Sequence, residues 1–144
     1  MAFRRILVAV DFSEPSRVAL HMAADLAKEM GAQLTVIHVY QLPVYPLPEG
    51  VVLPTQQALA DLFERVNRAL ADWKGGAEAR GAKKVETKSA EGAPWRTIVE
   101  QARTGEHDLI VVGTHGHTGA KHLFLGSVAE RVVRHAHCPV LSVR

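Results

Sequence analysis

Apolar and polar residues follow two different rhythms along this chain of 144 residues. Short, almost continuous apolar runs at 4–10, 33–40 and 108–112 are typical of strands that are covered on both faces of a sheet. The segment 85–89 alternates apolar and polar residues, as an exposed edge strand does, and 139–143 is a final apolar run. We predict all five segments as strands.

Between these runs, apolar residues recur at i, i+3 and i+4, which predicts four helices. Ser13 is the expected N-cap of the first helix, and Gly31 the residue that follows its end. Further helices are expected over 55–81, 94–102 and 126–133. Alternation of strands and helices implies right-handed crossovers. The predicted fold class is therefore α/β: an open, twisted, five-stranded parallel sheet in three layers, with helices on both faces.

A proline-rich segment interrupts this alternation at 41–54. Its prolines, Pro43, Pro46, Pro48 and Pro54, are incompatible with a regular helix. The segment is longer than an ordinary connection, so we predict a flap, a packing arm or a mobile loop. We expect the whole chain, 1–144, to form a single domain that carries this arm.

Composition narrows the class of function. The hydrophobic share of 47% and charged share of 22% are those of a globular domain, and a net charge of +2 is too small to indicate nucleic-acid or membrane partners. The run 6–10 is too short for a signal peptide, and no stretch approaches the 18 apolar residues of a membrane span. The single cysteine, Cys138, excludes an intramolecular disulfide and is compatible with the cytoplasm, where we expect the protein.

A glycine-rich segment after the fourth predicted strand is the strongest candidate site. Glycines let the backbone approach a ligand closely, and a helix beginning at Gly126-Ser127 offers unbonded amides to an anion. Residues 113–144 carry four basic side chains and one acidic side chain, Glu130, which also favours an anion. The spacing differs from the P-loop and from GxGxxG. The alternative is a tight strand-to-helix connection without a ligand.

The pattern Gly113-x-x-Gly116, nine residues, then Gly126-Ser127 resembles the nucleotide-binding pattern of the universal stress protein family. The segments ILVAVDFSEPS, HVY, DLIVVGTHG and HCPVLSVR agree, so the resemblance covers all but the proline-rich arm. It implies the adenine nucleotide alpha hydrolase-like fold, with strand order 3-2-1-4-5, and the subgroup that binds ATP. Function would then be that of a nucleotide-responsive regulatory module in the stress response.

The resemblance also implies roles for individual residues. Asp11 corresponds to an aspartate that meets the adenosine, the backbone of Val39 faces adenine, and Ala9 lines the pocket. The phosphates would be held by Gly113, Thr114, His115, Gly116, His117, Thr118, Gly126, Ser127 and Val128, with Mg²⁺ carried by the phosphates. A homodimer would form through the strand at Pro139–Val143.

Several alternatives stay open at this point. The protein could be a slow ATP hydrolase, with a loop histidine as base, or a dimeric scaffold that ignores nucleotides. Asp11 could serve only as a helix cap or in a local Asx turn. For His38 we favour a core histidine bonded to backbone over a catalytic role. For His135, His137 and Cys138 we expect no metal, because the spacing is not that of a closed site.

Overall fold

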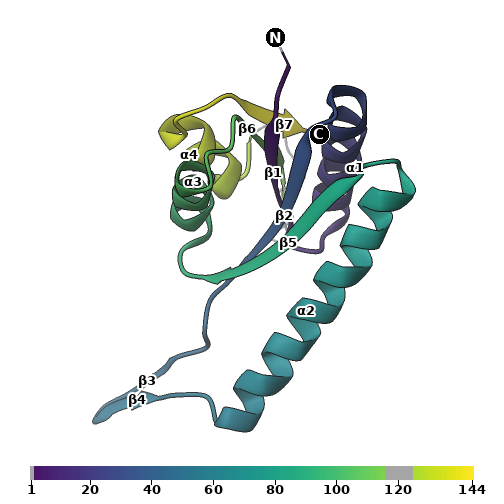
Figure 1. The fold of residues 1–144 in the computed structure, drawn as a ribbon. Coiled ribbons are helices and arrows are strands. Elements are labelled where there is room, and N and C mark those ends of the chain that lie inside the picture. The colour runs from purple at the N-terminus through teal and green to yellow at the C-terminus, as the bar shows by residue number, and fades with distance from the viewer. Residues whose placement is uncertain (1, 116–124) are drawn as a thin grey trace.

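Five parallel strands form the central sheet in the computed structural model, which describes residues 2–115 and 125–144 (Figure 1). Their order across the sheet is β5-β2-β1-β6-β7. Their bounds are Arg5–Ala9 (β1), Gln33–Tyr40 (β2), Lys84–Glu91 (β5), Leu109–Gly113 (β6) and Val140–Val143 (β7). Numbered along the chain among themselves, these strands have the order 3-2-1-4-5, so the predicted fold class is confirmed. Their ends differ from the predicted ones by at most two residues.

Four helices cover the sheet, two on each face (Figure 1). Their bounds are Glu14–Met30 (α1), Gln56–Ala79 (α2), Pro94–Thr104 (α3) and Ser127–His135 (α4). The buried residues of α1 and α2 belong to one apolar cluster, and those of α3 and α4 to a second cluster on the opposite face. Among the described residues, no helix has both the length and the apolar character needed to cross a membrane.

The central strand β1 shows why the apolar runs are continuous. Ile6 and Val8 pack into the cluster under α1 and α2, whereas Leu7 packs into the cluster under α3 and α4. All three side chains are fully buried, because successive residues of a strand point to opposite faces and both faces are covered.

The caps of α1 are the predicted ones. The hydroxyl of Ser13 accepts a hydrogen bond from the backbone N–H of Ser16, and Gly31 follows the helix in the left-handed conformation, with φ 65°. Because only four residues separate the end of β1 from the start of α1, the turn between them lies at the carboxyl edge of the sheet. This edge is where parallel α/β sheets bind ligands.

The proline-rich segment forms a hairpin that the sequence pattern does not predict. Strands β3 (Tyr45–Leu47) and β4 (Gly50–Val52) pair antiparallel, with Tyr45 opposite Val52. The arm extends away from the sheet beyond the start of α2 (Figure 1), and all its strand residues are exposed. It is therefore not an arm packed on its own domain. The alternation of apolar and polar residues that usually marks a strand in a sequence is absent here, because neither face of this hairpin is covered.

Candidate functional site

A pocket of about 260 Å³ opens at the carboxyl edge of the sheet, between the ends of β1 and β6. From β1 the chain first builds outward through β2 and β5, and then returns to the other side of β1 with β6 and β7. The pocket therefore lies at the point where the strand order reverses, which is the usual ligand position in open α/β sheets.

The pocket brings together the predicted site residues that the structure describes. Nine of the twelve line it, and they are Ala9, Asp11, Val39, Gly113, Thr114, His115, Gly126, Ser127 and Val128. The remaining three, Gly116, His117 and Thr118, lie outside the described residues. Residues from both halves of the chain thus converge on one cavity, although Ala9 and Val128 are far apart in sequence.

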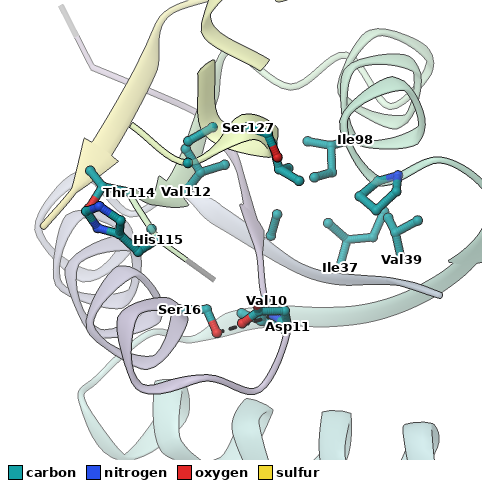
Figure 2. Close-up of a pocket in the computed structure, with 16 residues that line it drawn as sticks. Val10, Asp11, Ser16, Ile37, Val39, Ile98, Val112, Thr114, His115 and Ser127 are labelled. Atoms are coloured by element: carbon teal, nitrogen blue, oxygen red, sulfur yellow. Dashed lines mark hydrogen bonds between the residues drawn. The ribbon is translucent and has the colours of Figure 1, made fainter. Parts of the chain in front are cut away.

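One side of the pocket is apolar. Figure 2 shows Ile37 and Val39, from β2, facing Ile98 of α3 across this side, and Pro94 at the start of α3 completes the lining. The side chains of Ile37 and Ile98 are buried. Such a wall favours a flat, weakly polar group and offers hydrogen bonds to it only from the backbone.

The floor of the pocket carries an acid, Asp11, two residues beyond the end of β1. Its Oδ1 accepts hydrogen bonds from the N–H of Ser13, at 3.0 Å, and from the hydroxyl of Ser13. Its own N–H donates to Oγ of Ser16 at 3.3 Å (Figure 2). Asp11 therefore forms an Asx turn, and its two bonds to Ser13 fix the carboxylate at the pocket floor.

A further side is formed by the start of α4, where Figure 2 shows Ser127 near Ile98, and by the end of β6, with Thr114 and His115 farther to the left. Gly126 is the N-cap of α4, and no side chain of the described residues caps this helix. The first-turn amides of Ser127 and Val128 have no acceptor within an α-helix, and they carry the positive end of its dipole. This side is suited to an anion.

Two of the predicted glycines serve packing more directly than ligand approach. A Cβ on Gly113 would lie 2.9 Å from the carbonyl oxygen of Pro15, and one on Gly126 would lie 2.9 Å from the carbonyl oxygen of Thr114. The N–H of Gly126 donates to that same Thr114 oxygen, and the N–H of Thr114 donates to Val143. A side chain at 126 would therefore collide with the backbone of Thr114. Among the described residues, the amides that can meet an anion on this side are those of the first turn of α4.

Seven lining residues were not among the predicted ones: Val10, Ser16, Ile37, Pro94, Ile98, Val112 and Ala129. Most are apolar residues at strand ends or in the first turns of helices, and they look like ordinary core residues in the sequence. Ser16 has a usable signal, because it follows Asp11 by five residues and lies in the first turn of the adjoining helix.

Two other candidate positions lie outside the pocket lining: His38, and the group of His135, His137 and Cys138. Nδ1 of His38 is 2.8 Å from the carbonyl oxygen of Val10, which confirms a histidine bonded to backbone. Burial and the carboxylate of Asp108 raise the pKa of the Cys138 thiol, the opposite of nucleophile activation. In the part of the chain that the structure describes, no three His, Cys, Asp or Glu residues are grouped so that they could hold a metal ion.

Comparison with known sequences identifies the family. The model of the universal stress protein family matches residues 2–144. A universal stress protein of Methanocaldococcus jannaschii is 40% identical over 99% of this chain and 82% of its own length. Universal stress protein YxiE of Bacillus subtilis is 35% identical over 99% of both chains.

Solved structures agree with the sequence relatives. Universal stress protein UspA from Lactobacillus plantarum superposes with a TM-score of 0.84 at 28% identity, over 100% of this chain and 99% of that one. A universal stress protein in complex with cAMP gives a TM-score of 0.74 at 28% identity, over 100% and 98% of the two chains. Because the family model matches almost the whole length of the chain, the chain belongs to the universal stress protein family.

Proposed function

We propose that the pocket binds an adenine nucleotide, with ATP as its ligand, and that occupancy makes the protein a nucleotide-responsive regulatory module in the stress response. The observation that carries this proposal is the combination of surfaces that line one cavity: an apolar wall, a fixed carboxylate and an uncapped helix start. A nucleotide presents one group suited to each: a base, a sugar and phosphates. The cAMP complex of a structural relative supports the adenine nucleotide class.

The base would lie against Ile37, Val39 and Ile98. Burial of the two faces of a purine against aliphatic side chains is favourable by the hydrophobic effect. Polar recognition of the base edge would then come from the backbone near Val39, since the side chains of this wall have no donor or acceptor.

The ribose hydroxyls would donate to the carboxylate of Asp11. A hydrogen bond to a charged acceptor contributes about 1.5–3 kcal/mol, more than a neutral one. Because the Asp11 carboxylate is already held by Ser13, little side-chain entropy is lost when the ligand binds.

The phosphates would be held at the start of α4. The N–H groups of Ser127 and Val128 and the hydroxyl of Ser127 are the donors that the described residues supply there. Gly116, His117 and Thr118 remain proposed phosphate contacts. Mg²⁺ would be carried on the phosphate oxygens, where it offsets their charge.

The proposal is for binding with little or no turnover. Rapid hydrolysis of ATP uses a cation against the transferred phosphoryl group and a group that orients the water. No lysine or arginine lines the pocket among residues 2–115 and 125–144. Of the candidate bases, His115 lines the pocket and is 3.0 Å from Oγ1 of Thr114 through its Nδ1.

The proposed homodimer would use the outer edge of β7. This strand pairs with β6 on one side and ends the sheet on the other, so its second row of backbone groups faces outward. Antiparallel pairing of two β7 strands, Pro139–Val143 with its copy, would join the sheets across a two-fold axis. Light scattering after chromatography would return twice the chain mass if this is correct, and the chain mass of 15.7 kDa if it is not.

Calorimetric titration of the purified protein with ATP, GTP and tripolyphosphate, each with Mg²⁺, tests the nucleotide proposal. We expect ATP to bind more tightly than GTP, because the apolar wall suits adenine, and tripolyphosphate to bind weakly. Saturation at one hundred times the dissociation constant would raise the unfolding free energy by about 2.7 kcal/mol. Absence of heat and of thermal stabilisation would instead support a scaffold, and phosphate released beyond one equivalent would support a hydrolase.

A further inference from the structure

Phe12 has a backbone conformation that is rare for an aromatic residue. Its φ is 65°, in the left-handed region that glycine adopts readily and bulky residues avoid. Such a conformation persists only where the surroundings enforce it, and it concentrates at functional sites. Phe12 directly follows Asp11, the acid of the pocket floor, so the strain lies next to the proposed ribose contact.

Two aromatic side chains hold Phe12 in place. Its ring lies 4.4 Å from the ring of His38, at an interplanar angle of 31°, and 5.3 Å from Trp73 in an edge-to-face arrangement. The two ring contacts of Phe12, with His38 and with Trp73, form a clamp. Because His38 comes from β2 and Trp73 from α2, the clamp connects the β1–α1 turn to two other elements. Trp73 is buried.

His38 also holds the residue on the other side of Asp11. Its Nδ1 lies 2.8 Å from the carbonyl oxygen of Val10. A carbonyl only accepts, so Nδ1 carries the hydrogen and donates it. The imidazole therefore binds the residue before Asp11 through a hydrogen bond and the residue after it through ring contact.

We propose that Phe12 and His38 are positioning residues for Asp11: together they fix the turn that aims its carboxylate at the ribose. This inference rests on the proposed nucleotide function. The donors of α4 belong to a different segment and do not depend on the clamp. Loss of the clamp therefore weakens the sugar contact and leaves the phosphate contact in place.

The test compares ATP with 2′,3′-dideoxy-ATP, which lacks the ribose hydroxyls. In the wild type we expect ATP to bind about tenfold more tightly, the effect of a hydrogen bond to a charged group. In Phe12→Ala the ratio should fall below about twofold, because alanine leaves the left-handed region once the clamp is gone. The ratio in Phe12→Gly should lie between those of the wild type and Phe12→Ala, since glycine still reaches that region.

Phe63→Ala is the matched control. Phe63 also makes an aromatic contact, 5.8 Å from the ring of Tyr40, but it does not line the pocket. In this variant, the ratio of the affinities for ATP and 2′,3′-dideoxy-ATP should equal that of the wild type. A wild-type ratio in Phe12→Ala would overturn the inference.

Amide exchange in the ligand-free protein separates this inference from the nucleotide proposal. The N–H of Ser13 is bonded to the Asp11 carboxylate, so its exchange rate reports where that carboxylate lies. Phe12→Ala should accelerate exchange of the Ser13 amide at least tenfold more than exchange of the core amide of Ile110. General destabilisation would accelerate the exchange of both amides alike. If the wild type binds no nucleotide and Ser13 still responds in this way, the nucleotide proposal fails and the positioning of Asp11 stands. An equal response of the two amides overturns the positioning role.

Discussion

Gly113, at the end of β6, lies so close to the backbone of Pro15, in the first turn of α1, that a side chain at 113 would collide with it. A Cβ built on Gly113 would lie 2.9 Å from the carbonyl oxygen of Pro15 and 3.3 Å from the nitrogen of Ser16. Both neighbours are backbone atoms and cannot turn aside. This close approach brings the first turn of α1 against the end of β6, where Gly113 and Ser16 line the same pocket.

Gly113→Ala should therefore destabilise the protein by about 1–3 kcal/mol, as overpacking against fixed atoms does. Gly75→Ala is the matched control, because an added Cβ there meets nothing within 4 Å and Gly75 lies within α2. That change should stabilise the protein by up to about 1 kcal/mol. Urea unfolding measures both. Equal stabilities for Gly113→Ala and the wild type would contradict the close contact.

Stability should decrease in mildly acidic solution because of His107. This side chain is 6% exposed, and its Nε2 lies 3.0 Å from Oγ1 of Thr35. Burial holds its pKa below the ordinary 6.5, although nearby backbone carbonyls favour the charged form. Below about pH 6.5 the unfolded chain thus binds a proton that the folded protein does not, so the unfolding free energy falls as the pH falls.

Comparison with His107→Gln isolates this contribution from that of the other seven histidines. The unfolding free energies of both proteins are measured between pH 8 and pH 5. The loss of stability on acidification should be smaller in the variant. Parallel curves would show that His107 is not responsible.

Much of the fold follows from patterns that tertiary packing reinforces. The runs at β1, β2 and β6 are apolar on both faces because helices cover both faces, and Ser13 and Gly31 mark the ends of α1 because capping is a local property. The β3–β4 hairpin was not predictable in this way. Its strands are three residues long, contain Pro46 and bury neither face.

The arm should be dispensable for the fold. Its exposed apolar residues are Val44, Tyr45, Leu47, Val51, Val52 and Leu53, and none belongs to the buried core. Replacement of residues 44–53 by a short Gly-Ser connection should change the unfolding free energy by less than about 1 kcal/mol, since little apolar surface is lost from the core. Thermal unfolding at a much lower temperature would mean that the arm packs on the domain.

Cys138 should react slowly in the folded protein. Its thiol pKa is raised by burial and by the Asp108 carboxylate, so the reactive thiolate is scarce at neutral pH. Reaction with an aromatic disulfide reagent at pH 7.5 should be much slower in the native state than in urea. Similar rates in both states would contradict this view of the site.

The candidate site shows a different limit of sequence reasoning. The predicted residues that are described do line one pocket, because strand ends and helix starts meet at the same edge of a parallel sheet. The left-handed Phe12 was not predictable, since an aromatic residue gives no sign of a conformation that His38 and Trp73 enforce. Likewise, the contact of Gly126 with Thr114 depends on tertiary structure.

If backbone amides at the start of α4 hold the phosphates, Ser127→Pro should weaken ATP binding. Proline fits the first position of a helix and removes the N–H there, and the extended ψ of 160° at Gly126 is compatible with a following proline. Ser127→Ala, which keeps the amide, is the control. We predict by calorimetry that ATP affinity falls at least tenfold in Ser127→Pro and by less in Ser127→Ala, with the folded stability of both retained. Wild-type ATP affinity in Ser127→Pro would contradict the account.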